Sequence, residues 1–167
     1  MAEQSLQQHP IPALFDDQSR ILVLGSFPSV KSREGRFFYH HPQNRFWRVL
    51  AAVLDEPVPG NVEEKAAMLH RNHIALWDVI ASCRITGSSD SSICDVVPND
   101  LTPILTGAPI QAVFCNGGTS ARYYRRYTRP ATGLEAVTLP STSPANAAWS
   151  LDRLTDAWSV ILHDLAE

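Results

Sequence analysis

Four short, largely apolar runs are the feature that most constrains the fold of this chain. The runs are Ile21–Leu24, Ile74–Trp77, Ala112–Cys115 and Ala136–Leu139. Runs without polar alternation are typical of strands that are buried on both faces of a parallel sheet. Helix-like stretches follow them or lie between them, at residues 43–54, 62–72, 99–106, 118–127 and 146–165. Strands that alternate with helices predict an α/β chain, a three-layer α/β/α sandwich with a central, mainly parallel four-stranded sheet.

The length and composition of the chain predict one domain. With 167 residues, of which 44% are hydrophobic, the chain has enough apolar surface for one substantial core, which we place at residues 20–167. Residues 1–19 are polar and contain two prolines, so we expect a loosely ordered lead-in. No apolar stretch is long enough to cross a membrane, and the chain does not begin with the basic and then apolar residues of a signal peptide. These observations predict a cytoplasmic protein without a membrane partner.

Charge and cysteine content exclude some classes of protein. The three cysteines are too few and too widely spaced for a zinc knuckle or a disulfide framework, so we expect free thiols and no metal. The net charge of −3 argues against binding nucleic acid by bulk electrostatics. The arginines nevertheless cluster in residues 33–48 and again in residues 122–129, where tyrosines lie among them. That mixture is typical of nucleic-acid surfaces, although an ordinary solvated helix face has the same pattern.

Unusual residues follow each apolar run. In parallel sheets the ligand crevice lies outside the carboxyl ends of the strands, so these segments are where we expect the chemistry. They are Gly25–Ser29, Asp78, Asn116–Gly118 and Pro140–Asn146. The stretch 84–97, rich in serine, reads as a long polar loop over the same site.

Another segment, residues 39–47, adds a polar residue next to the expected crevice. Asn44 opens a predicted helix, and Phe46 and Trp47 on the inward face would hold it near the crevice. A simple helix cap is the plainer interpretation of Asn44. Asp78 has a plainer role as a turn-forming residue, and Asn116 as one that tolerates a left-handed turn.

Three ordered motifs resemble the uracil-DNA glycosylase superfamily. They are Gly25–Ser29, His41–Trp47 and Leu139–Asn146, of which the middle one resembles the mismatch-specific uracil and thymine glycosylases. Together with residues 75–80 and 115–117, the set is most similar to the hypoxanthine-DNA glycosylase branch, and the resemblance spans residues 20–165. It implies a monofunctional DNA glycosylase that hydrolyses the N-glycosidic bond of a deaminated, flipped-out base, with hypoxanthine as the expected base. The resemblance also implies a monomer that needs no cofactor.

One departure from the family pattern affects the choice of catalytic residue. Relatives place Asp or Asn at the third position of the first turn, where it holds the attacking water, and this chain has Phe27 there. The resemblance to the hypoxanthine branch implies that Asn44 takes over this role. Excision does not require a strong base, because placed dipoles can stabilise an oxocarbenium-like sugar and a departing anionic base.

The remaining roles divide between the base pocket and the DNA surface. We expect Phe27 and Tyr39 to stack on the extruded base, and the backbone amides of Ser26 and Phe27 to face its oxygen. Asp78 and Asn116 are the candidates for contacts with the base edge. The small hydroxyls of the last motif are expected to donate to phosphates, and the resemblance implies that the end of this loop enters the minor groove. The residues expected to contact DNA are Ser141, Thr142, Ser143, Pro144, Ala145, Asn146, Arg45, Arg122 and Arg126.

Other functions stay open on the sequence alone. Removal of uracil or mismatched thymine differs from the main hypothesis only in the pocket. A catalytically silent DNA-binding module is another hypothesis, because Phe27 replaces the usual water holder. A lyase step would need an activated Lys31, and a hydrolase would need Ser26 or Cys115, neither of which lies in a recognisable nucleophile elbow.

Overall fold

The structure, a computed structural model, describes residues 4–165 and is built around a four-stranded sheet. The strands lie in the order β3-β2-β6-β7, and all neighbours are parallel. Their bounds are β2 (Ile21–Gly25), β3 (Ile74–Asp78), β6 (Ala112–Asn116) and β7 (Ala136–Leu139). Each predicted apolar run is therefore a strand, and the predicted parallel sheet is confirmed.

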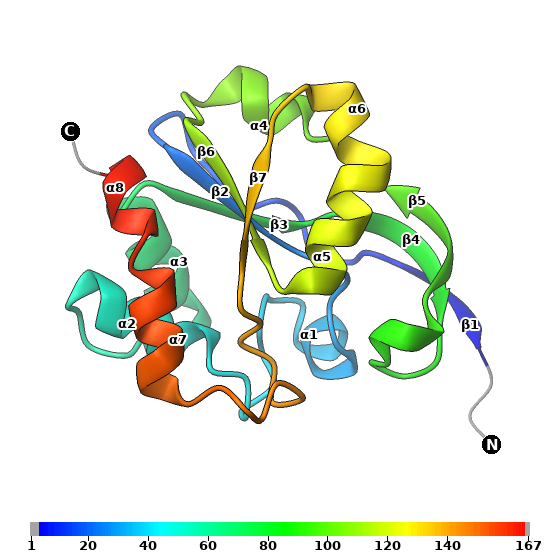
Figure 1. The fold of residues 1–167 in the computed structure, drawn as a ribbon, viewed down its shortest axis with the longest axis horizontal. Coiled ribbons are helices and arrows are strands. Elements are labelled where there is room, and N and C mark those ends of the chain that lie inside the picture. The colour runs from blue at the N-terminus through cyan, green and yellow to red at the C-terminus, as the bar shows by residue number, and fades with distance from the viewer. Residues whose placement is uncertain (1–3, 166–167) are drawn as a thin grey trace.

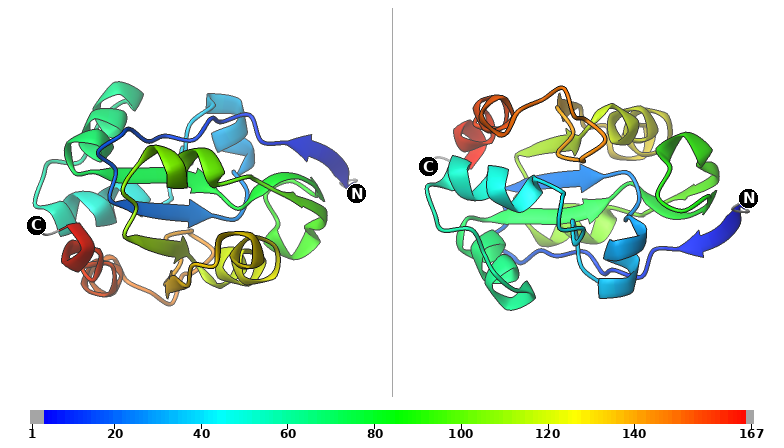
Figure 2. Two further views of the ribbon diagram at one scale, coloured as in Figure 1. Left: turned by 90° about the horizontal axis from the view of Figure 1, so that it is seen from above. Right: turned by 90° about the horizontal axis from the view of Figure 1, so that it is seen from below.

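Helices cover both faces of this sheet, as Figures 1 and 2 show. Successive strand residues point to opposite faces, so Ile21 and Val23 belong to one buried cluster and Leu22 and Leu24 to the other. The helices of the first cluster are α2 (Phe46–Leu54), α3 (Val62–Arg71), α7 (Leu151–Trp158) and α8 (Ile161–Leu165). The second cluster includes residues of α4 (Thr102–Gly107) and α5 (Gly118–Tyr123). Two cores on opposite faces make the α/β/α sandwich.

Some helices begin or end at residues other than those predicted. The stretch 146–165 becomes helical only at Leu151, because the Ser150 side chain accepts a hydrogen bond from the Arg153 amide and caps the helix there. The stretch 118–127 extends further than predicted. After α5 come a π-helical turn (Tyr124–Thr128) and α6 (Arg129–Thr132), which ends at Gly133 with a φ of 70°.

A second, antiparallel sheet was not predicted from the sequence. It has the order β1-β4-β5, with β1 (Ser5–Gln8), β4 (Ile80–Ile85) and β5 (Cys94–Pro98). The prediction of one long polar loop over residues 84–97 is therefore wrong at both ends. Only residues 86–93 connect β4 to β5, with a 3₁₀ turn at Asp90–Ser92. The strands are short, and polar or charged residues interrupt their apolar ones. They therefore lack the continuous apolar run that revealed the main sheet.

The N-terminal segment is packed against the domain, in contrast to the loosely ordered lead-in that we predicted. Residues 4–19 include β1, which pairs with the edge of β4, and Leu14, which exchanges two backbone hydrogen bonds with Leu76 of β3. The Trp77 indole also donates to the Ile11 carbonyl at 3.0 Å. The unpaired backbone groups of an edge strand explain why a polar segment binds there. Residues 1–3 of the predicted lead-in lie outside the described residues.

The carboxyl ends of the parallel strands lie at the lower edge of the sheet in Figure 1. There α1 (Val30–Gly35), the segment that precedes α2 and the orange loop that follows β7 come together. Among residues 4–165, no helix is both long and apolar enough to span a bilayer.

Candidate active site

A cavity of about 360 Å³ lies at the carboxyl ends of the parallel strands. Four parts of the chain line it: the turn 25–29, residues within 38–44, the strand-end residues Asp78 and Asn116, and the loop 141–145. Ser88 and Asp90 of the β4–β5 connection also line it, so this shorter loop lies over the site as expected. The volume is within the range of small-molecule pockets. The segments that the sequence placed at one edge thus share one cavity.

The turn that begins with Gly25 at the end of β2 lines the cavity, and two polar groups lie very close to its backbone. A Cβ atom on Gly25 would lie 2.3 Å from Asp78 Oδ1 and 3.0 Å from the Tyr39 hydroxyl. Only glycine therefore allows both side chains to approach this turn. Ser26, the next residue, donates from its hydroxyl to Asp90 Oδ1 at 3.4 Å.

Phe27 and Tyr39 line the cavity, and each ring already has an aromatic or cationic neighbour. The Phe27 ring is buried, with the Arg33 guanidinium 5.5 Å from its centroid. The Tyr39 ring stacks on Phe46 with centroids 4.1 Å apart. One face of the Tyr39 ring is thus used by Phe46, and stacking of either ring on a base stays a prediction.

Asn44 lines the same cavity, and its side-chain oxygen is held by two partners. Asn44 Oδ1 accepts from the Phe46 amide at 2.9 Å and from the Thr142 hydroxyl at 2.8 Å. The first bond is the capping role that was the plainer interpretation, and the second ties the residue to the last motif. A carbonyl oxygen has two lone pairs, and these two hydrogen bonds use both of them. The Nδ2 hydrogens are the part of the amide that is left for the cavity.

Asn116 and Thr142 form a reciprocal pair. The Thr142 amide donates to Asn116 Oδ1 at 3.0 Å, and Asn116 Nδ2 donates to the Thr142 hydroxyl at 3.0 Å. Thr142 is fully buried, so the prediction that its hydroxyl binds phosphate is wrong. The hydroxyl instead accepts from Asn116 Nδ2 and donates to Asn44 Oδ1. The left-handed position in this turn is Gly117, with a φ of 93°, and not Asn116.

Arg45 also has a different role from the phosphate contact that we predicted. Its Nη2 donates to the backbone carbonyls of Ser143 and Asn146 at 3.0 Å each, and its Nη1 donates to the carbonyl of Trp149. These bonds hold the loop after β7 from the inside. Arg45 therefore shapes the proposed DNA-contacting loop.

The rest of this loop presents small groups at its surface. Pro144 and Ala145 are exposed, and the Asn146 side chain is braced against the Ser141 carbonyl at 3.0 Å. The Ser141 and Ser143 hydroxyls each accept a backbone amide from within the loop. Each hydroxyl keeps its own hydrogen for an outside acceptor.

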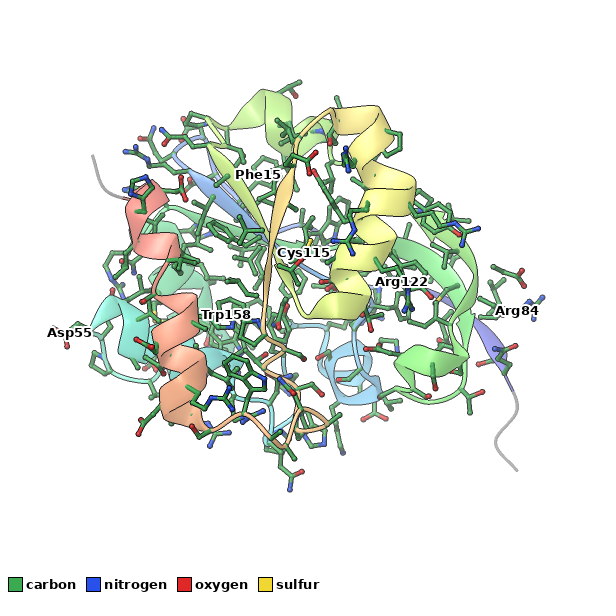
Figure 3. The ribbon with its side chains drawn as sticks, in the orientation of Figure 1. Phe15, Asp55, Arg84, Cys115, Arg122 and Trp158 are labelled. Carbon is green, nitrogen blue, oxygen red and sulfur yellow. The ribbon has the colours of Figure 1, made fainter. Side chains whose placement is uncertain are left out.

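Arg122 and Arg126 are exposed on α5 and the π-helical turn that follows it. Each guanidinium lies 5.1 Å from the ring centroid of the next tyrosine, Tyr123 or Tyr127. Figure 3 shows Arg122 on the side of α5 that faces β4 and β5. Both side chains are exposed, and phosphate contacts by these two arginines stay a prediction.

His9 is the site residue that the sequence did not reveal. Its Nε2 lies 2.7 Å from Asp78 Oδ2, and both side chains are almost fully buried. Pro10 and Pro12 favour an extended backbone next to His9, which is the sole hint of an ordered segment there. The pairing itself joins residues far apart in sequence and needs the fold.

The structure also bears on the alternative nucleophiles. Cys115 is fully buried, and this burial raises the pKa of its thiol to about 11, so the reactive thiolate is scarce at neutral pH. Lys31 is exposed on α1, outside the desolvated setting that activates a lysine amine. Within residues 4–165, no group of three or more His, Cys, Asp or Glu side chains is placed to hold a metal ion.

Replacing Arg45 by alanine is expected to destabilise the loop after β7. Loss of a guanidinium that bonds three carbonyls should lower the free energy of unfolding by about 2 kcal/mol and increase amide exchange in residues 141–149. Denaturant titration and hydrogen exchange measure these effects. Arg48→Ala is the matched control, because the exposed Arg48 reaches only the Gln43 carbonyl at 3.5 Å. Equal behaviour of the two variants would contradict the bracing role.

Comparison with known proteins agrees with this site. Residues 12–165 match the sequence model of the uracil DNA glycosylase superfamily. A hypoxanthine DNA glycosylase of Methanosarcina acetivorans is 35% identical over 153 residues, which are 91% of this chain and 96% of the relative. A hypoxanthine DNA glycosylase of Methanosarcina barkeri is 32% identical over 156 residues, which are 92% of this chain and 97% of the relative.

A solved structure is similar over nearly the whole chain. It is a solution NMR structure of a Methanosarcina acetivorans protein assigned provisionally to the uracil DNA glycosylases. The TM-score is 0.81 at 31% identity, and the match covers 96% of this chain and 99% of that one. The chain therefore belongs to the uracil DNA glycosylase superfamily. It is a DNA N-glycosylase, an enzyme that cleaves the bond between a base and its deoxyribose.

Proposed function

We propose that this chain is a monofunctional glycosylase that removes hypoxanthine from DNA and so begins base-excision repair. The two Methanosarcina relatives, which match more than nine tenths of the chain, are named for hypoxanthine. The observation that carries the proposal is the common cavity of the Gly25–Ser29 turn and Asn44. An enzyme that acts on one base must flip it out of the stack into a pocket of this kind.

The reaction needs little more than placed dipoles. Water adds to the anomeric carbon as the glycosidic bond breaks, the base leaves with the bonding electrons, the added water releases a proton to solvent, and the departing base anion takes up one from solvent. Free hypoxanthine and an abasic site are the products. Positive charge on the sugar makes it reactive toward a weak nucleophile, so positioning of the water contributes more than a strong base.

Asn44 is the residue that we assign to hold this water. Its Oδ1 is fixed by the Phe46 amide and the Thr142 hydroxyl, so the orientation of the amide is set before DNA binds. The Nδ2 group can then donate to the water oxygen, which keeps a lone pair for the attack. Such preorganised donors act without a reorganisation cost at the moment of reaction.

The surface around the cavity is assigned to DNA. Pro144, Ala145 and Asn146 form the proposed wedge that fills the space of the flipped nucleotide, and Ser141 and Ser143 donate to phosphates. Arg122 and Arg126 add charge on the neighbouring helix. All the assigned groups come from one chain, so we propose that the enzyme works as a monomer. The cytoplasmic location stays a prediction.

A panel of duplexes tests the proposed function. End-labelled duplexes carrying one hypoxanthine, uracil, xanthine or mismatched thymine are incubated with the protein and treated with alkali, which cuts the strand at abasic sites. We expect the fastest scission on the hypoxanthine duplex and none before alkali. Scission without alkali would indicate a lyase, and uracil or thymine as the preferred base would replace hypoxanthine in the proposal. DNA binding with no scission on any duplex would indicate a silent module.

A further inference from the structure

A buried histidine bonds a buried carboxylate that lines the cavity. His9 Nε2 is 2.7 Å from Asp78 Oδ2, and the two side chains are 3% and 5% exposed. This bond uses Oδ2, whereas Oδ1 is the oxygen that lies beside Gly25. Asp78 lines the cavity, so its side chain connects His9 to the place where a base would sit.

The surroundings of His9 determine which ring nitrogen carries the proton. The Ile11 amide donates to His9 Nδ1 at 3.2 Å, so this nitrogen is an acceptor. In the neutral ring the proton is then on Nε2, which donates to Asp78 Oδ2. The histidine therefore occupies one oxygen of the carboxylate and leaves the other as an acceptor.

His9 itself is held firmly by the N-terminal segment. Its amide donates to the Ala81 carbonyl at 2.8 Å, directly after the pairing of β1 with β4. Its ring is enclosed by Phe27, Phe38 and Trp77, with centroid distances of 6.0, 6.4 and 6.1 Å. Because these contacts fix the His9 ring, its hydrogen bond also fixes the position of the Asp78 carboxylate.

The Tyr39 hydroxyl is the second polar group that lies beside Gly25, and Tyr39 also lines the cavity. The hydroxyl is buried, and within the described part of the chain no group meets full hydrogen-bond geometry with it. Burial, and then the nearby Asp78 carboxylate, raise the pKa of Tyr39 more than the nearby Asn116 side chain lowers it, so the hydroxyl keeps its proton and can donate. Tyr39 also has a left-handed φ of 50°, an uncommon conformation for a bulky residue that is often found at functional positions.

An acceptor beside a donor matches the edge that deamination creates. Hypoxanthine presents a ring N1–H donor next to the O6 acceptor. Adenine, its parent, presents a ring N1 acceptor next to an amino donor, which is the opposite pattern. A carboxylate oxygen and a phenol hydroxyl would bond the first edge and leave the second unpaired, and unpaired buried polar groups cost affinity.

We propose that Asp78 Oδ1 and the Tyr39 hydroxyl recognise the N1–H and O6 edge of the flipped base, and that His9 is a positioning residue that fixes Asp78 for this contact. The assignment rests on the proposed excision of a deaminated base, and adds the groups that distinguish this base from adenine. His9 acts through Asp78 and touches no reacting atom.

Variants of His9 separate base recognition from general stability. His9→Gln keeps a side-chain N–H donor, His9→Phe removes it, and His70→Gln is the matched control, since His70 pairs with Asp16 at the surface. Two quantities are measured for each: the single-turnover rate on a hypoxanthine duplex, and the affinity for a duplex with a tetrahydrofuran abasic site. The second duplex offers no base, so recognition of the base edge does not affect its binding.

We expect His9→Phe to lower the rate about tenfold or more, with unchanged affinity for the abasic duplex. His9→Gln should recover most of the rate, and His70→Gln should match the wild type. The preference of His9→Phe for hypoxanthine over unsubstituted purine, which lacks both N1–H and O6, should also fall. Parallel loss of rate and abasic-site affinity, or a wild-type rate in His9→Phe, would overturn the proposal. If the wild-type protein excises no deaminated base, the proposed function itself fails.

Discussion

Replacing Asn44 by alanine is expected to lower the rate of hypoxanthine excision by about a hundredfold or more, the usual effect of removing a placed transition-state contact. The Asn44 amide reaches the cavity from a position that is fixed by Phe46 and Thr142. Alanine removes the donor that we assign to the attacking water, and with it the acceptor of the Thr142 hydroxyl. Single-turnover kinetics with excess enzyme measure the chemical step directly.

Gln43→Ala is the matched control for this variant. Gln43 is the preceding residue and is exposed, and its hydrogen bonds within residues 4–165 are made by its backbone: the amide donates to His41 Nδ1 at 3.1 Å, and the carbonyl accepts from Arg48 at 3.5 Å. Affinity for the hypoxanthine duplex should stay close to the wild-type value in both variants, because the water contact contributes to the transition state and not to binding of the DNA. A wild-type excision rate in Asn44→Ala would refute the water-holding role.

Most of the main sheet could be predicted from the sequence because three of its strands, β2, β3 and β6, are largely buried, whereas the edge strand β7 is half exposed. Buried strands need continuous apolar residues, and Ile21–Leu24 and Ile74–Trp77 show them without any knowledge of the fold. The position of the site followed from the same prediction, since parallel strands end at one edge. The small sheet had no comparable pattern. Its edge strand β1 has the sequence SLQQ and is mostly exposed, so backbone pairing and not apolar burial holds it.

Contacts between distant polar residues account for most of what the sequence did not reveal. Thr142 looked like a phosphate ligand because it lies between two serines, and its partners Asn116 and Asn44 are 26 and 98 residues away. Arg45 looked like a surface charge because it lies in a cluster of arginines, and its carbonyl partners in Ser143 and Asn146 are 98 and 101 residues away. A residue type and its neighbours indicate what a side chain can bond. Which partner it has depends on the packed structure.

The polar groups of the site form one connected system. Asn116 bonds Thr142, Thr142 bonds Asn44, and Arg45 next to Asn44 holds the loop that carries Thr142. The proposed water holder and the proposed DNA wedge are thereby fixed to each other and to the end of β6. A change in one member should therefore affect the others more than separate pairwise bonds would predict.

Gly25→Ala is expected to abolish most of the excision activity, with a loss of about a hundredfold or more if the base-edge contacts are displaced. The added Cβ would lie 2.3 Å from Asp78 Oδ1, which is closer than real contacts allow, and 3.0 Å from the Tyr39 hydroxyl, which is tighter than most real contacts. Asp78 cannot simply move away, because His9 holds its other oxygen at 2.7 Å. The crowding should also lower the free energy of unfolding by about 1–3 kcal/mol, as overpacking in a core commonly does.

Gly118→Ala is the control that separates crowding from the loss of a glycine. Gly118 follows the neighbouring strand β6, begins α5, and has no heavy atom within 4 Å of an added Cβ. Alanine there should keep the activity and stabilise the helix by up to about 1 kcal/mol. Excision assays and thermal unfolding of both variants provide the comparison. If Gly25→Ala excised hypoxanthine as fast as Gly118→Ala does, the close approach of Asp78 and Tyr39 to the first turn would have no part in recognising the base.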